Sequence, residues 1–142
     1  MNRQTALKAV LVLVCAAHLI LGIIGYFAPP EPVANMIASL YGATLTMTPQ
    51  LQHMIRILGA FMVAIGILAA FALQDPQKNR SIIYGIVVLL LLRVSQRLVF
   101  AQEIHEHFQV SYGKLWIQSI FFLALAVALL WLRPKTSESL RI

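Results

Sequence analysis

The chain is poor in charged residues, and above all in acidic ones. Of its 142 residues only 11% are charged and 60% are hydrophobic, whereas a soluble domain carries about 25% charged residues. Because so few polar residues cannot cover the surface of a soluble globule of this size, lipid must cover the apolar surface. We therefore expect one integral membrane domain that includes residues 1–142.

Cysteine is scarce as well. The single Cys15 lies inside an apolar run, which excludes a disulfide framework and a cysteine-based zinc site within one chain. The sequence also has no nucleophile elbow, phosphate-binding loop or paired-carboxylate motif. These absences disfavour the familiar enzyme classes, so an enzyme is the less favoured interpretation.

Basic residues exceed acidic ones, 11 against 5, for a net charge of +6. A basic chain can bind nucleic acid, but such proteins gather their charge in one stripe or tail. Here most of the basic residues lie in short segments between apolar runs, where membrane proteins carry them. We therefore expect membrane lipids, a second copy of the chain or a membrane protein as partners, and no nucleic acid.

What the sequence does have is four long apolar runs, at about residues 6–28, 51–73, 81–101 and 113–132. Each has roughly the 20 residues that a helix needs to cross a hydrocarbon core of about 30 Å. In lipid the backbone must satisfy its own hydrogen bonds, which favours helices over open strands. The predicted fold class is all-α, a bundle of four transmembrane helices.

The distribution of Lys and Arg predicts the orientation of this bundle. They lie before the first run, between the second and third, and after the fourth, as Arg3, Lys8, Lys78, Arg80, Arg133, Lys135 and Arg141. Only Lys114 lies in a loop on the opposite side. The positive-inside rule then places both termini in the cytoplasm. We expect a multi-pass protein of the cell's inner (plasma) membrane.

The connection between the first two runs carries its own pattern. Val33, Met36, Ile37, Leu40 and Tyr41 recur at helical spacing, which predicts a short amphipathic helix over about residues 32–42. It would lie in the outer interface or cap the bundle, as a plain cover or as a gate.

Three arginines lie inside the apolar runs, where each costs about 2.5–3.5 kcal/mol on insertion scales. Arg93 and Arg97 share one side of the third helix with Gln96, because residues three and four apart lie on one face. Antiparallel helices would bring Arg56 and His53 to the same outer level. Guanidinium groups suit phosphate or carboxylate groups.

The leading hypothesis is therefore a pocket for an anionic lipid or small molecule, formed by Arg56, Arg93, Arg97, Gln96 and His53. One alternative keeps the arginines structural, with Arg56 and Arg97 paired to Glu103 or to helix-end carbonyls in an accessory or assembly subunit.

Histidines raise two further possibilities. His105 and His107 with Glu103 form a weak metal-ligand pattern at the end of the third run, consistent with a metal-dependent membrane enzyme. Haem between His18 and His53 is disfavoured, because His18 lies near the middle of its run and His53 at the edge of another. No cofactor is predicted, and His18 is expected to be a hydrogen-bonded core residue.

Small residues predict close helix approach. Gly22 and Gly25 in the first run, and Gly59 and Gly66 in the second, allow backbones to meet.

The motifs Arg56-Ile-Leu-Gly59-Ala, Gly66-Ile-Leu and Arg93-x-x-x-Arg97 resemble the small four-helix bacterial membrane proteins of the BphX-like and DoxX-like kind. The resemblance extends over about residues 50–130. It implies a four-helix inner-membrane protein, sometimes associated with oxidative or catabolic systems. Its DoxX-like side implies an accessory redox role, although this chain has no cysteine pair.

Overall fold

The computed structural model describes residues 2–134, so the predicted cytoplasmic residues Lys135 and Arg141 lie outside the described part. In this part the chain is all-helical, and four of its helices are long and apolar enough to cross a membrane. This confirms the predicted fold class. The helices are α1 (Arg3–Phe27), α2 (Pro30–Tyr41), α3 (Pro49–Gln74), α4 (Arg80–Val99), α5 (Ala101–Phe108) and α6 (Tyr112–Leu132).

Local sequence signals fix where these helices begin and end. The side chains of Asn2, Thr48 and Ser111 accept hydrogen bonds from backbone N–H groups in the first turns of α1, α3 and α6, as N-cap residues do. Gly42 ends α2 in the left-handed conformation, with φ of 71°, which glycine adopts without strain. The predicted amphipathic helix over about residues 32–42 is α2, beginning two residues earlier.

Helix α5 was not predicted. The chain turns at Phe100, whose φ and ψ of −104° and 24° lie outside the helical region, and then continues as a helix through the polar residues after α4. Ala101, Ile104 and Phe108 recur at helical spacing in this segment, and Ala101 and Ile104 pack against a hydrophobic cluster. The amphipathic signal was therefore present in the sequence, in a short and otherwise polar run.

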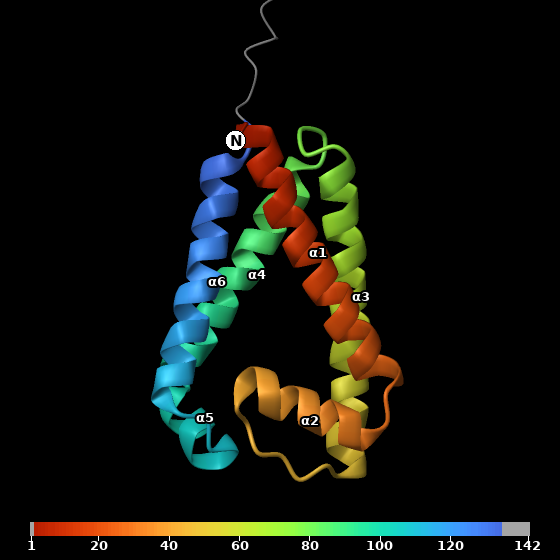
Figure 1. Ribbon diagram of the computed structural model, residues 1–142, viewed down its shortest axis with the longest axis vertical. Helices are drawn as coiled ribbons and strands as arrows, with labels where there is room; N and C mark the ends of the chain where they lie inside the picture. The colour runs from red at the N-terminus through yellow and green to blue at the C-terminus, as the bar shows by residue number, and fades with distance from the viewer. Residues whose placement is uncertain (1, 135–142) are drawn as a thin grey trace, which may run out of the picture.

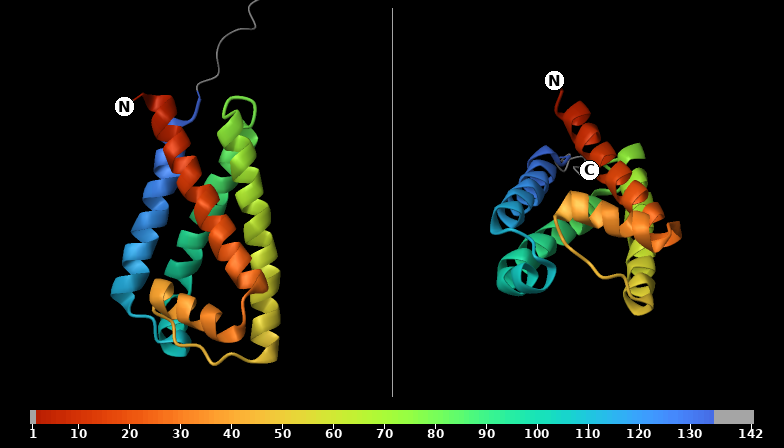
Figure 2. Two further views of the ribbon diagram at one scale, coloured as in Figure 1. Left: turned by 45° about the vertical axis from the view of Figure 1, so that its right-hand side comes forward. Right: turned by 60° about the horizontal axis from the view of Figure 1, so that its bottom comes forward.

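The long helices form two pairs rather than an evenly packed bundle. Helix α1 packs along α3 and α4 along α6, and the pairs converge at one end and separate at the other, so that Figure 1 shows a shape like an inverted V. We call these the closed end and the open end. Helices α3 and α4 are antiparallel, as predicted, but touch little beyond their connecting turn, and α2 lies across the open end (Figures 1 and 2).

The closed end holds the main apolar core. All three of α1, α4 and α6 contribute fully buried leucine or isoleucine side chains there, with small alanines from α3; the cluster comprises Leu7, Leu11, Val14, Ala69, Ala72, Ile83, Ile86, Val87, Leu90, Ala126 and Leu129. At the rim the Arg3 guanidinium donates a hydrogen bond to the Trp131 carbonyl. The start of α1 and the end of α6 are therefore joined at this end.

Glycines hold α1 and α3 together, as predicted. A Cβ added to Gly22 would lie 2.8 Å from the Val63 nitrogen, and one added to Gly59 would lie 2.7 Å from the Tyr26 nitrogen. Real Cβ atoms do not approach backbone so closely, so only glycine permits this crossing. The rigid contact sets the position of the α3 residues that follow and precede it.

Helix α2 is attached to the other pair at the open end. The Gln118 Nε2 group on α6 donates a hydrogen bond to the Leu40 carbonyl at 2.9 Å. The Thr44 N–H, after α2, donates to the Phe108 carbonyl of α5 at 3.0 Å. A small cluster of Ala43, Val110 and Leu115 is buried beneath these contacts. Helix α2 thus bridges the two separated pairs.

Candidate functional site

A cavity of about 500 Å³ lies between the helix pairs at the open end. Ligand pockets in proteins typically have about 300–1,000 Å³. The lining is largely apolar and comes from all six helices and two loops; it comprises Leu21, Gly25, Met36, Ile37, Tyr41, Ala43, Leu45, Ile55, Leu58, Gly59, Met62, Arg93, Gln96, Arg97, Ile104, Phe108, Val110, Leu115 and Gln118. Its charged groups are two arginines, both from α4.

Arg93 and Arg97 are half-buried and share one aromatic neighbour. Their guanidinium carbons lie 5.8 and 4.8 Å from the centre of the Phe122 ring on α6. The guanidinium carbon of Arg97 also lies 5.7 Å from the centre of the Tyr41 ring on α2. Cation–π contacts within about 6 Å orient a guanidinium but leave its N–H donors unpaired. The aromatic rings therefore hold the two guanidinium groups in place, and their N–H donors remain available for a ligand.

No carboxylate neutralises these arginines among residues 2–134, where neither forms an ion pair or a hydrogen bond. The acidic residues nearest in sequence lie exposed on α5, where Glu106 accepts a hydrogen bond from Gln102 at 2.9 Å. Glu103, the predicted structural partner of Arg97, forms no such pair in the described chain. The cavity therefore carries two positive charges without a counter-charge from the described protein.

His18 lies beyond the deep end of the cavity. Its Nδ1 is 2.8 Å from the Val14 carbonyl, which can only accept, so Nδ1 carries the proton and Nε2 is a bare acceptor. His18 is only 5% exposed, and its Nε2 has no partner among the described residues. It shares a face of α1 with the cavity residues Leu21 and Gly25, three and seven positions further on.

Half of this arrangement at His18 was predictable from the sequence. His18 is a buried histidine with a hydrogen bond, as expected, but that bond uses one nitrogen only. An unpaired buried acceptor costs about 1–3 kcal/mol, so it marks a place where a donor from outside the chain would be favourable. The signal for it in the sequence was a histidine inside an apolar run, three residues before Leu21 and therefore on the same face of the helix.

The structure divides the predicted ligand residues between two places. Arg93, Gln96 and Arg97 line the cavity, whereas Arg56 and His53 line a separate hollow on the outer side of the α1–α3 pair. On α3 the side that faces the cavity carries Ile55, Leu58, Gly59 and Met62. Arg56 follows Ile55 by one residue, a rotation of about 100° around the helix axis, and so faces outward.

The predicted metal residues do not gather into one site. His105 is used within its own corner, where Nδ1 bonds to the Val110 carbonyl at 2.9 Å and the ring stacks on Tyr112. His107 follows two residues later and points to another side of the short helix α5. Within residues 2–134 no group of three or more His, Cys, Asp and Glu side chains is arranged to hold a metal ion.

Comparison with known proteins adds one match. Residues 6–99 match the model of a family described as a domain of unknown function, DUF4345. Neither a curated protein nor a solved structure matches the chain. No named relative thus supports the resemblance to BphX-like and DoxX-like proteins, which stays a prediction. The matched segment includes most of α1 and all of α2 to α4, and therefore both cavity arginines, but not the residues of α5 and α6.

Proposed function

The chain belongs to the family of the domain of unknown function DUF4345, and we propose that its cavity binds an anionic amphiphile, a molecule with one phosphate or carboxylate head and an apolar tail. The observation that carries this proposal is the pair of half-buried arginines, Arg93 and Arg97, in a largely apolar cavity without a carboxylate partner among residues 2–134. Guanidinium groups pair with such heads through charge-assisted hydrogen bonds.

The apolar lining of the cavity favours an amphiphile over a small free anion. Beyond the arginines the lining is composed mainly of aliphatic side chains, such as Ile37, Ile55 and Leu115. A free phosphate ion would leave this surface without contact, whereas an acyl chain would fill it. Leu58 and Gln96 line the cavity and are also exposed, on α3 and α4. Lateral entry from the bilayer would pass between these two helices, which touch little beyond their connecting turn.

The proposed orientation puts this cavity in the outer half of the bilayer. The described basic residues of the termini and of the α3–α4 turn lie at the closed end, and Lys114 lies at the open end (Figure 1). The positive-inside rule then makes the closed end cytoplasmic. In a bacterial cell the membrane would be the inner one, and the cavity would face its outer leaflet.

A second candidate function follows from the cation–π contacts. Arg97 on α4 touches Tyr41 of α2 and Phe122 of α6, so it connects three elements. The same contacts suit an accessory or assembly subunit whose arginines fix the helix arrangement for a protein partner. The predicted resemblance to DoxX-like proteins implies a role of this class. Under this alternative the cavity would bind no ligand.

Binding of dodecyl phosphate to the protein purified in a mild neutral detergent tests the proposal. Wild-type protein should bind dodecyl phosphate and not inorganic phosphate or dodecanol, because both the head and the chain are needed. The double variant Arg93→Gln, Arg97→Gln removes two charge-assisted hydrogen bonds, each worth about 1.5–3 kcal/mol. The dissociation constant should therefore rise about 100-fold or more, as titration calorimetry would measure.

Two controls separate the candidates. The Lys78→Gln variant removes an exposed charge in the turn between α3 and α4, away from the cavity, and should bind dodecyl phosphate like wild type. Thermal unfolding of the double variant shows whether the helices still assemble. Wild-type protein that binds no dodecyl phosphate would overturn the proposal. Binding of inorganic phosphate with the same affinity would replace the amphiphile by a small anion.

A further inference from the structure

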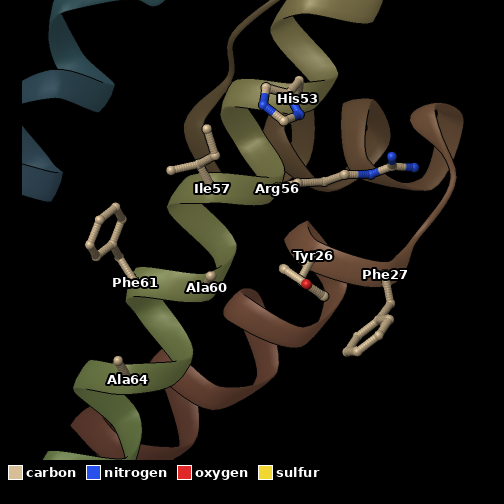
Figure 3. Close-up of a pocket in the computed structure, with 8 residues that line it drawn as sticks. All are labelled: Tyr26, Phe27, His53, Arg56, Ile57, Ala60, Phe61 and Ala64. Atoms are coloured by element: carbon tan, nitrogen blue, oxygen red, sulfur yellow. The ribbon is translucent and has the colours of Figure 1, made fainter.

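A second hollow lies on the outer surface of the α1–α3 pair, away from the cavity. It has a volume of about 780 Å³ and is lined by Tyr26 and Phe27 from the end of α1 and by residues of α3 that include His53, Arg56 and Phe61. Figure 3 shows the Arg56 side chain extended from α3 on the side where α1 ends at Phe27. The small side chains of Ala60 and Ala64 continue the hollow along α3 as a groove.

Everything around Arg56 is exposed on a surface that would face lipid. Phe27 is 74% and Phe61 64% exposed, and both belong to helices long and apolar enough to cross a membrane. Arg56 itself is exposed, and among the described residues it has no ion pair, hydrogen bond or ring contact. A charge inside a membrane-spanning helix is costly unless an anion or water satisfies it.

We propose that this groove binds a membrane phospholipid with a net negative headgroup, whose phosphate pairs with Arg56 and whose acyl chain lies along Ala60 and Ala64. The site is separate from the cavity and does not depend on the function proposed for it. Arg56 lies seven residues from the start of α3 at Pro49, about 10 Å along the helix. A long arginine side chain can extend over such a depth towards the headgroups.

Three features favour this occupant over a protein partner. The cation meets the charge of the phosphate, and the His53 ring one turn away can add a second donor. Tyr26 and Phe27 stack edge to face with ring centres 4.7 Å apart, at the level where aromatic side chains prefer the membrane interface. The groove continues along the small, apolar side chains of Ala60 and Ala64, which leave room for an acyl chain.

The test places a fluorescent reporter in the groove. The variant Phe61→Trp, in a background of Trp116→Phe and Trp131→Phe, has its single tryptophan beside the proposed acyl chain. The protein is reconstituted into phosphatidylcholine vesicles with a minor fraction of either brominated phosphatidylglycerol or brominated phosphatidylcholine. Bromine quenches tryptophan on contact. Brominated phosphatidylglycerol should occupy the groove about fivefold better, equal to about 1 kcal/mol for one interfacial arginine.

Matched variants decide what causes the preference. Arg56→Gln should reduce the ratio to about 1, and Arg56→Lys should keep part of it, because lysine keeps the charge and loses the bidentate geometry. Arg93→Gln, in the cavity, should leave the ratio unchanged. Equal quenching by the two lipids with Arg56 present would overturn the proposal. A ratio that falls equally in the Arg56 and Arg93 variants would also overturn it, because it would show a general surface charge effect.

Discussion

The same four helices form a buried apolar core at the closed end of this protein and a cavity with charged side chains at the open end. At the closed end, aliphatic side chains and alanines form the main apolar core, and Leu11, Ala69 and Leu129 are completely buried. At the open end the pairs separate, and the space holds two arginines without an acidic partner among the described residues. The closed-end core joins the two pairs, and the glycine crossing holds α1 against α3. The open end can therefore keep a cavity.

Polarity can be placed at the open end of such a small membrane domain more easily than at the closed end. A charged group in a tightly packed apolar core would have to be neutralised by the protein itself. At the open end, a helix laid across the mouth covers the cavity while leaving room for a molecule to neutralise the arginines. Helix α2 and its two hydrogen-bonded attachments are therefore part of the proposed site, although α2 contributes no charged residue to its lining.

The largest effect on stability is expected at the closed end. Leu11→Ala removes a fully buried side chain from the core and should lower the free energy of unfolding by about 2–5 kcal/mol. Met62→Ala, at the cavity wall, should cost about half as much, because its side chain already borders empty space and loses fewer contacts. Unfolding by denaturing detergent in mixed micelles measures both. Equal losses would show that the open end is packed as tightly as the closed end.

A somewhat smaller effect is expected at the glycine crossing that joins α1 and α3. Gly59→Val would place its Cβ 2.7 Å from the Tyr26 nitrogen and 2.8 Å from the Gly22 carbonyl oxygen. Backbone atoms cannot move aside cheaply, so the variant should lose about 1–3 kcal/mol of stability in the same assay. It should also weaken dodecyl phosphate binding, since Gly59 lines the cavity.

The same substitution on another helix provides the matched control. A Cβ added to Gly85 on α4 would have no heavy atom within 4 Å, so Gly85→Val should leave the unfolding midpoint and the binding almost unchanged. A Gly59→Val protein as stable as the Gly85→Val protein would show that the crossing does not hold α1 and α3 together.

The sequence predicted the elements of the fold well and their packing poorly. Runs of about 20 apolar residues specify membrane helices by length alone, and the four spans and α2 follow from that and from one amphipathic period. The separation of the helix pairs does not follow. Helices that are apolar on every side give no signal of which face meets which partner, so an even bundle was as consistent with the sequence as the observed pairs.

The same limit explains the outcome at the candidate site. The spacing of Arg93, Gln96 and Arg97 sufficed to place them on one face of α4, because that follows from helix geometry. That Arg56 lies near the same end also followed from antiparallel topology. Its outward direction depended on the rotation of α3, which the Gly22–Gly59 contact sets. That Nε2 of His18 has no partner among the described residues could be recognised only from the three-dimensional positions of Val14 and the other neighbours.

The smallest effect is expected where α2 is attached to the open end. Gln118→Leu removes the hydrogen bond to the Leu40 carbonyl, one of the last carbonyls of α2, which lack partners within the helix. Such a bond contributes about 0.5–1.5 kcal/mol, so amide hydrogen exchange in α2 should become about fivefold faster while exchange in the closed-end core does not change.

The control for this attachment is Gln50→Leu, a loss of the same amide at an exposed position at the start of α3. It should leave exchange in α2 at the wild-type rate. If α2 exchanges as slowly in Gln118→Leu as in wild type, the bridge is held by the apolar cluster of Ala43, Val110 and Leu115 alone. If it exchanges faster and dodecyl phosphate dissociates faster as well, the cover of the open end also controls how long the cavity keeps its ligand.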